Sequence, residues 1–330
     1  MRSDWLRRLA PWLVLGLGLV AGIGLQTQLY SAQERLVSTA LMYVGLASAW
    51  NLVGGFTGYA CFGQVGFFGL GAYTTALLMY HLHWSFWLAL PIAAVVAGAF
   101  AALIGAPLLR LRGHYFAVAT LGVAEGVREV VINLPRLTGG GGGISIPATG
   151  NAAPTRWLGN DGFYILFLLL AVGAVAVSIV VANSRAGYAL RAIHQDEDAA
   201  AAMGIRTTRA KNLAFTVSAA ITGAIGAAYG FQLQAIYPNP LFDVGITVLL
   251  VVMVVFGGFG TVVGPVVGAF VIALGSEWLR ANYTQVHTFL LGGLILVAVI
   301  LLPQGVGTYL RDAVRTRRFS LLDNVRRYRI

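Results

Sequence analysis

The sequence contains few charged residues and a single cysteine. Only 10% of its 330 residues are Asp, Glu, Lys or Arg, whereas 58% are hydrophobic. A soluble domain has about 25% charged residues, so this chain could not cover its surface with groups suited to water. The single cysteine, Cys61, excludes a disulfide within the chain and is typical of a packing residue. The composition therefore indicates an integral membrane protein.

Sequence signatures of enzymes and metal sites are also missing. The only lysine, Lys211, lies in no glycine-rich loop and is followed by Asn212, so the phosphate-binding pattern GxxxxGK[ST] is absent. The five histidines form neither an HxxxH pattern nor a cysteine–histidine set. No nucleophile and base stand in a recognisable arrangement. We therefore expect no enzyme activity, no metal site and no cofactor in this chain.

Apolar runs of transmembrane length make up most of the sequence. Because these runs are continuous rather than alternating, helices are the expected spanning elements. We predict an all-α polytopic membrane protein with about ten spans of about 20 residues each. The predicted spans are Leu9–Leu25, Leu36–Leu52, Phe62–Tyr80, Phe86–Leu109, Phe116–Leu134, Phe163–Ala182, Leu213–Ile236, Ile246–Phe256, Val262–Trp278 and Phe289–Leu302.

Glycine-rich turns break two of the predicted hairpins, at Gly54–Gly63 and at Gly257–Pro265. Irregular backbone at membrane depth is tolerated only inside protein or beside a water-filled cavity. The two turns look alike, which is compatible with an internal repeat and also with two independent hairpin turns.

The distribution of basic residues predicts the orientation in the membrane. If the N-terminus is cytoplasmic, seventeen of the 22 basic residues lie inside, four lie outside, and Arg128 lies within a span. The positive-inside rule favours this orientation, with both termini cytoplasmic. The net charge of +10 then reflects topology and contact with anionic membrane lipid, and no nucleic-acid partner is expected. We divide the chain into a transmembrane domain, residues 1–310, and a basic cytoplasmic tail, residues 311–330.

A dense charged segment, residues 184–211, interrupts the apolar chain on the predicted cytoplasmic side. It carries eight charged side chains, whereas the thirty residues before it carry two. Its centre is typical of a short helix, because Asp196 suits the N-cap and Gly204 suits the position that ends a helix. An isolated helix of this length is marginal in water, so we expect it to be held by another structure and to offer an alanine face to a partner. An ordinary solvated loop is the alternative.

Residues Gly187–Ile205, GYALRAIHQDEDAAAAMGI, resemble the cytoplasmic coupling loop of importer permeases in ATP-binding cassette (ABC) systems. Glu197 matches the acidic position of that loop, whereas Asp198 is charged where an apolar residue is common. The chain as a whole resembles the M-type permease of branched-chain amino acid transporters. The matching stretches are NLVGGFTGYACFGQVGFFGLGAYTTALL, LRLRGHYFAVATLGVAEGVREVV, LTGGGGGI, VVFGGFGTVVGPVVGAFV and LLPQGVG. Of these, LRLRGHYFA and LTGG favour the M-type over its H-type sister.

The resemblance implies a permease subunit of an ABC importer that moves branched-chain amino acids across the bacterial inner membrane. The implied partners are an H-type permease subunit, two cytoplasmic ATPases that carry ATP and Mg, and a periplasmic substrate-binding protein. Alternative substrates are urea, short amides or other amino acids, and an alternative class is an ion-coupled secondary transporter or channel. The residues expected to couple to the ATPases are Arg191, Asp196, Glu197, Asp198, Ala200, Ala201 and Gly204.

Polar residues within spans are candidates for the substrate pathway. Glu125, Arg128 and Glu129 share one helix face, and ionisable residues inside a span are functional candidates by default. We expect this face to look into the bundle or a wet cavity, where it either lines the pathway or joins helices as an ion pair. Three neutral polar residues flank the first glycine-rich turn and are further pathway candidates: Asn51, Gln64 and Tyr73. The alternative for Asn51 and Gln64 is that they satisfy backbone groups freed by the turn.

Overall fold

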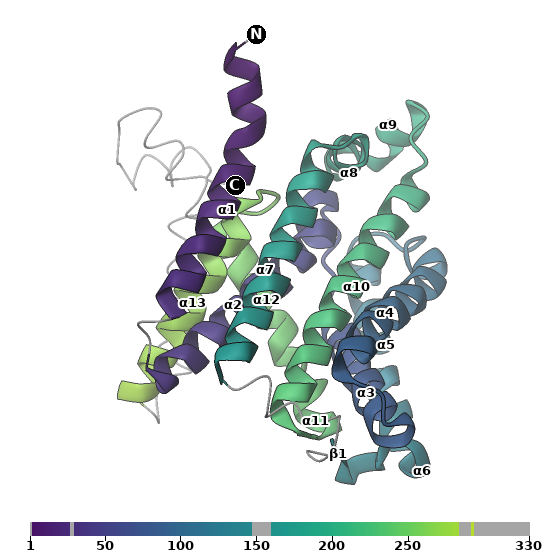
Figure 1. The fold of residues 1–330 in the computed structure, drawn as a ribbon. Coiled ribbons are helices and arrows are strands. Elements are labelled where there is room, and N and C mark those ends of the chain that lie inside the picture. The colour runs from purple at the N-terminus through teal and green to yellow at the C-terminus, as the bar shows by residue number, and fades with distance from the viewer. Residues whose placement is uncertain (1, 27–29, 147–159, 284–291, 294–330) are drawn as a thin grey trace.

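The computed structural model describes residues 2–26, 30–146, 160–283 and 292–293. These residues form a bundle of helices, as the apolar composition predicts (Figure 1). The long helices are α1 (Arg2–Gln26), α2 (Ser31–Thr57), α3 (Gln64–Leu82), α4 (Phe86–Leu108), α5 (His114–Ile132), α7 (Asn160–Asn183), α10 (Thr207–Leu233), α12 (Val244–Gly257) and α13 (Val263–Asn282).

Short elements close the two ends of the bundle. At one end lie α8 (Arg185–Gln195) and α9 (Glu197–Ala202), and the N-terminal end of α1 points the same way (Figure 1). At the other end, β1 (Ile144–Ser145) pairs antiparallel with β2 (Ala235–Ile236), with Ile144 opposite Ile236. Beside this pair lie α6 (Pro135–Thr138), the 3-10 turn η1 (Gly140–Gly142) and α11 (Pro238–Leu241).

Six helices within the described part of the chain are long and apolar enough to cross a membrane. The predicted first and ninth spans fall in α1 and α13, whose apolar stretches, Pro11–Gln26 and Val263–Leu279, are shorter, and the fifth falls in α5, which carries three residues of the Asp, Glu, Lys and Arg types. The tenth, Phe289–Leu302, lies outside the described residues except for positions 292–293. The structure thus supports a polytopic all-α membrane protein, while the number ten stays a prediction. The candidate spans are Gln33–Thr57, Gln64–Leu82, Phe86–Leu108, Asp161–Asn183, Thr207–Leu233 and Pro238–Gly257.

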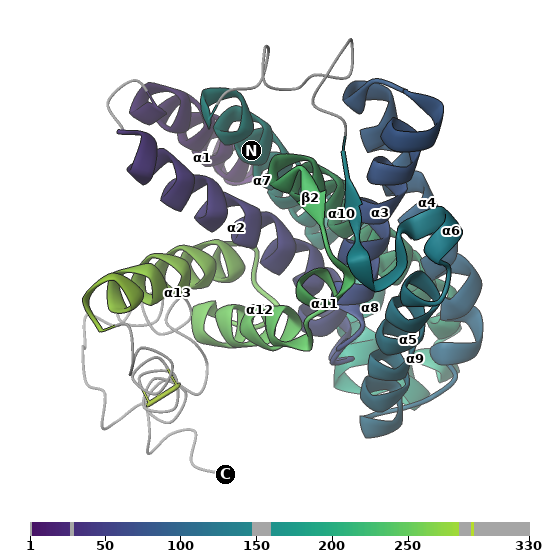
Figure 2. The same cartoon turned by 90° about the horizontal axis from the view of Figure 1, so that it is seen from below.

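Helix α2 lies in the interior of the bundle. It packs against α7 on one side and against α12 and α13 on the other, as the view along the bundle shows (Figure 2). Helix α10 contacts α2, α3 and α4. Small residues permit this packing: a Cβ at Gly226 of α10 would come within 2.0 Å of the carbonyl oxygen of Phe68 in α3. Such close backbone approach is how helices associate in a membrane.

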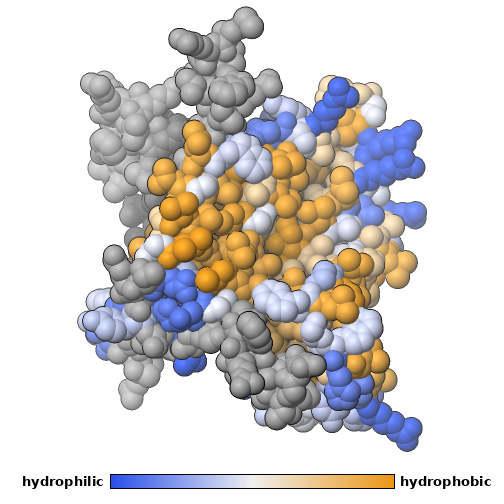
Figure 3. Space-filling view, in the orientation of Figure 1, coloured by the Kyte–Doolittle hydropathy of each residue, from blue (hydrophilic) through white to orange (hydrophobic). Residues whose placement is uncertain are grey.

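The surface agrees with a membrane location. A broad hydrophobic belt covers the middle of the face formed by α7 and α10, and hydrophilic residues gather towards the two ends (Figure 3). Large exposed apolar side chains of these two helices include Leu169 and Val180 of α7 and Leu213 of α10. Lipid hydrocarbon is the solvent suited to such a surface.

Candidate functional site

The charged segment at residues 184–211 contains the predicted short helix, α9, at the end of the bundle (Figure 1). The Asp196 carboxylate caps its start: Oδ1 accepts hydrogen bonds from the backbone N–H groups of Asp198, at 2.9 Å, and Ala199, at 3.0 Å. Gly204 follows its end with φ +85°, a left-handed conformation that glycine adopts without strain. Local capping chemistry therefore sets both boundaries of α9.

A second helix, α8, precedes α9 and was not among the predicted elements. Ser184 caps it by accepting a hydrogen bond from the Gly187 N–H at 3.2 Å. Arg191 ties α8 to the bundle, because its guanidinium donates to the Ala182 carbonyl at 2.7 Å and lies 5.6 Å above the Phe56 ring. Arg191 thus anchors the segment to its own chain.

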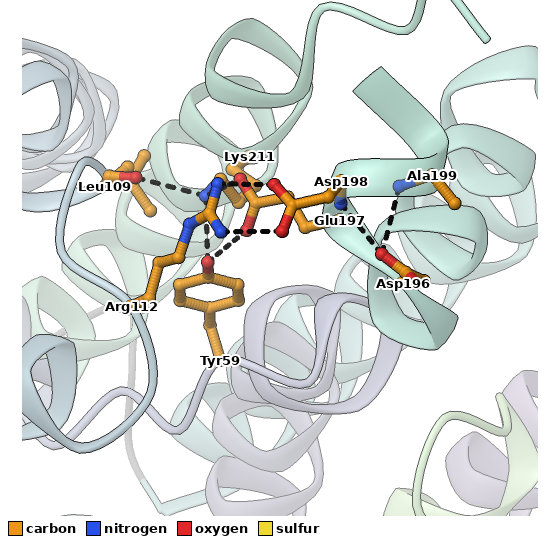
Figure 4. A network of polar contacts seen from close by, with 8 residues as sticks. All are labelled: Tyr59, Leu109, Arg112, Asp196, Glu197, Asp198, Ala199 and Lys211. Carbon is orange, nitrogen blue, oxygen red and sulfur yellow. Dashed lines mark hydrogen bonds and ion pairs between the residues drawn. The ribbon is translucent and has the colours of Figure 1, made fainter. Parts of the chain in front are cut away.

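Glu197, in the first turn of α9, points into the bundle and joins a polar network (Figure 4). Its Oε1 pairs with Lys211 Nζ at 2.7 Å, and its Oε2 accepts a hydrogen bond from the Tyr59 hydroxyl. Lys211 Nζ also donates to Tyr59 Oη and to the Leu109 carbonyl oxygen, each at 3.0 Å. The Tyr59 ring adds a cation–π contact, with its centroid 4.2 Å from Nζ. The Lys211 side chain is only 2% exposed.

The network holds Glu197 in its ionised form. Burial alone raises the pKa of this carboxyl, but hydrogen bonds from Lys211 and Tyr59 and the positive charge of Lys211 outweigh burial. The pKa of Glu197 therefore lies below its ordinary value of 4.5. A buried lysine and a buried carboxylate can both stay charged in a low-dielectric interior only when they pair with each other.

Asp198, the next residue along α9, pairs with Arg112 from the connection between α4 and α5. The guanidinium reaches both carboxylate oxygens, at 2.8 and 3.0 Å. The contact with Arg112 explains why position 198 carries a charge, although an apolar residue is common there in the coupling loops that this segment resembles. Arg112, through its hydrogen bonds and charge, lowers the pKa of Asp198. With side chains 61% and 76% exposed, the pair contributes little stability compared with the buried network.

The alanines of α9 face in opposite directions. Ala200 is completely buried against the bundle. Ala201 and Ala202 are exposed, and Met203 beyond them is 72% exposed. Of the two alanines predicted to meet a partner, only Ala201 is available for that contact.

Asn51 links the two glycine-rich connections. Helix α2 ends at Thr57 and α3 begins at Gln64, while α12 ends at Gly257 and α13 begins at Val263. Asn51 in α2 donates to the Thr261 carbonyl at 2.8 Å and accepts from the Gly260 N–H at 3.2 Å. Its amide therefore satisfies backbone groups of the second connection, whereas the interpretation from sequence assigned it to the first.

Gln64 and Tyr73 are also buried inside the bundle. Gln64 Nε2 donates to the Ser218 hydroxyl at 3.0 Å and to the Thr222 hydroxyl, both on α10. Tyr73 stacks on Phe242, with ring centroids 6.1 Å apart. Within the described part of the chain, Gln64 Oε1 and the Tyr73 hydroxyl have no hydrogen-bond partner.

Glu125, Arg128 and Glu129 do share one face of a helix, α5, but that face does not look into the bundle. The side chains are 44%, 30% and 52% exposed on the outside of the chain. Arg128 pairs with Glu125 at 2.7 Å and with Glu129 at 3.2 Å, all within α5. Within this chain, the cluster does not face the interior of the bundle and its ion pairs do not join two helices; Phe116, Thr120 and Ala124 occupy the packed face of α5 instead. A role of this face in the substrate pathway stays a prediction.

Sequence comparison identifies the family. A family described as the permease component of the branched-chain amino acid transport system matches residues 33–299. The chain belongs to this family. The permease is 32% identical over 294 residues to the high-affinity branched-chain amino acid transport system permease protein LivM of Salmonella typhimurium and to that of Escherichia coli, covering 82% of this chain and 69% of each relative. It is 24% identical over 303 residues to LivH of Salmonella typhimurium, covering 84% of this chain and 96% of that protein. No solved structure matches it.

Three residues of the site were not predicted: Tyr59 and Lys211 of the polar network, and Arg112, which pairs with Asp198. Tyr59 is 138 residues from Glu197 in sequence, and Lys211 is 152 residues from Tyr59. One available signal was that Lys211 is the only lysine and lies where the charged segment meets an apolar helix. A basic residue at such a place has to be paired, because an unpaired charge at the start of a buried helix is unfavourable. The permease therefore holds its charged segment through residues that are distant in sequence.

Proposed function

We propose that this permease is the membrane subunit of an ABC importer that moves branched-chain amino acids into the cytoplasm, and that separate ATPase chains drive it through α9. The observation that carries the coupling role is the two-sided construction of α9. Its inner side is fixed to the bundle by Glu197 and Ala200, and its outer side offers Ala201 and Met203 to a partner. The substrate class follows from the family and from the names of the LivM and LivH relatives.

The partners are a related H-type permease subunit, two cytoplasmic ATPases that hold ATP and Mg, and a periplasmic substrate-binding protein. An exposed apolar patch on a helix end is a common feature of protein docking sites. A groove on each ATPase would receive the outer side of α9, so that closure of the ATPases moves α9 and the helices behind it. Hydrolysis of ATP then belongs to the partner chains.

The H-type subunit meets the outward face of α5. Charged side chains at membrane depth face protein or water rather than hydrocarbon, and Glu125, Arg128 and Glu129 all lie on this face. The same face carries Gly122 and Gly126, where an added Cβ would have open space around it. Glycines spaced four apart let a second helix approach closely. We place the substrate pathway along this subunit boundary, since Asn51, Gln64 and Tyr73 are buried inside the chain.

The permease sits in the bacterial inner membrane with α9 and both termini in the cytoplasm. The excess of basic residues on that side supports this orientation, as does the common end shared by α9 and the start of α1 (Figure 1). Cysteine labelling in a Cys61→Ser background tests it. A cysteine at Asp198 should react only when the membrane is opened, and rapid labelling by an impermeant reagent added to intact cells would reverse the orientation.

Co-expression tests the proposed function. The permease, purified with its companion permease and ATPases and supplied with the binding protein in proteoliposomes, should take up leucine, isoleucine and valine. The same vesicles should be offered urea and acetamide, which distinguish the alternative substrates. Uptake of urea or amides without uptake of the branched-chain amino acids would overturn the substrate assignment. If no ATPase co-purified with the permease, the assignment to an ABC importer would be overturned.

A further inference from the structure

Lys211 is a buried cation that pairs with Glu197 on the inner side of α9, away from the proposed docking surface. It is the only lysine of the chain, and three oxygen atoms from three other segments surround its Nζ. These atoms belong to Glu197 of α9, to Tyr59 of the connection between α2 and α3, and to Leu109 at the end of α4 (Figure 4). Lys211 itself lies on α10. One side chain thus ties four segments together at the end of the bundle that carries α9.

A buried ion pair such as Lys211–Glu197 adds little net stability to a fold. Removing two charges from water is expensive, and replacing a buried ion pair by apolar residues of similar volume is often neutral or stabilising. An ion pair does, however, fix the distance and direction between the segments that hold it. The observed pair is nearly enclosed, with side chains 2% and 15% exposed for Lys211 and Glu197. The pair therefore serves to fix the position of α9 relative to α10.

The connection continues from α9 to both glycine-rich connections. Tyr59 follows Gly58, whose φ of +77° ends α2, and the next turn is held by Trp50, which donates from Nε1 to the Cys61 carbonyl at 2.7 Å. The Trp50 ring meets the Phe259 ring in the second connection, with centroids 6.2 Å apart. Glu197 is therefore linked to the first connection through the Tyr59 hydroxyl, and the backbone from Tyr59 to Cys61 and the Trp50 side chain extend the link to the second connection.

We propose that Lys211 is the positioning residue that transmits displacement of α9 to the glycine-rich connections, so that ATP hydrolysis drives transport. This inference rests on the proposed function and adds an inward-facing role for Glu197. A helix that only docked an ATPase could be held to the bundle by apolar packing alone. A helix that transmits movement needs a rigid contact with the helices behind it. The buried hydrogen bonds and ion pair among Lys211, Glu197 and Tyr59 form such a contact.

The test uses the complete reconstituted complex and measures amino acid uptake per ATP hydrolysed. In Lys211→Met, the outer side of α9 is unchanged, so the ATPases should still co-purify and hydrolyse ATP. Uptake per ATP should fall at least about tenfold, which lies within the range of coupling between two sites of one protein. Arg209→Met, which removes an exposed charge from the same helix, is the matched control and should keep the wild-type ratio. Wild-type coupling in Lys211→Met would overturn the proposal.

A double variant separates coupling from folding. Lys211→Met leaves the Glu197 carboxylate without its cation, which lowers stability and can lower abundance. Lys211→Met combined with Glu197→Met replaces the ion pair by apolar side chains and should restore abundance, while uptake per ATP stays low. A double variant that regains coupling, or one that still fails to accumulate, would assign the pair to folding and overturn the proposal. Failure of the wild-type complex to bind ATPases would instead overturn the proposed function.

Discussion

Two adjacent alanines of α9 provide a direct test of which side of this helix meets the ATPase. Ala200 is completely buried against its own bundle, whereas Ala201 is exposed. Replacing each by glutamate adds the same charge and volume at neighbouring positions of one helix. Glutamate is nearly as good a helix former as alanine, so the difference between the two variants reports their surroundings.

The two substitutions should differ widely in their effect on stability. At Ala200, a glutamate either forces an unpaired carboxylate into a filled site or pushes α9 off the bundle, and we expect a loss of at least about 3 kcal/mol. At Ala201, the carboxylate remains in water, and stability should change by no more than about 0.5 kcal/mol. Ala201→Glu should nevertheless bind the ATPase poorly, because a charge placed in an apolar interface weakens association by about 2 kcal/mol, or about thirtyfold.

The assays are thermal unfolding of the purified permease in detergent and titration of the ATPase onto it. Ser145→Glu is the matched control, since Ser145 is exposed at the opposite end of the bundle and the added charge is the same. Ala201→Glu should unfold like the wild type and bind the ATPase weakly. If Ala201→Glu bound the ATPase as tightly as the control does, the outer side of α9 would not be the docking surface.

Three further predictions concern the ends and charges of the site. Gly204→Val should strain the backbone at φ +85° by about 1–2 kcal/mol and weaken ATPase binding without unfolding the membrane helices. Gly204→Asn should be tolerated, because asparagine adopts this conformation more easily. Equal ATPase binding by the two variants, measured by co-purification, would contradict the role of Gly204. Arg128→Ala should change stability by only about 0.5 kcal/mol, because its ion pairs are exposed and lie within one helix, yet it should reduce recovery of the companion permease; unchanged recovery would remove α5 from the interface. Glu197→Gln should be less stable than the wild type at neutral pH, and this difference in stability should shrink as pH falls below 4.5. The folded-state pKa of Glu197 is depressed, so the stabilisation that its carboxylate provides is lost on protonation. A difference in melting temperature that did not depend on pH would show that the carboxylate charge is not what stabilises α9.

Local chemistry explains why α9 was predictable from the sequence. An N-cap aspartate and a glycine after the last turn act within a few residues, so Asp196 and Gly204 predict both ends of the helix without knowledge of the fold. The one-sided placement of Glu125, Arg128 and Glu129 on α5 follows from helical spacing in the same way.

Long-range packing explains what the sequence did not reveal. The direction in which the α5 face looks depends on which neighbours cover α5, and helical spacing carries no information about neighbours. Glu197 was expected to face an ATPase, but its partners Lys211 and Tyr59 come together only when α10 and the connection after α2 pack side by side. The buried position of Ala200 has the same origin. Sequence therefore predicts the elements of the site better than it predicts their orientation.

The energy source for leucine uptake tests the central claim most directly. Proteoliposomes containing the permease, its companion subunit and the ATPases, with binding protein and labelled leucine on the side opposite the ATPases, should accumulate leucine only when ATP is supplied on the ATPase side. Sodium or proton gradients imposed without ATP should give no accumulation. Uptake driven by an ion gradient in the absence of ATP and ATPases would contradict the account and identify a secondary transporter.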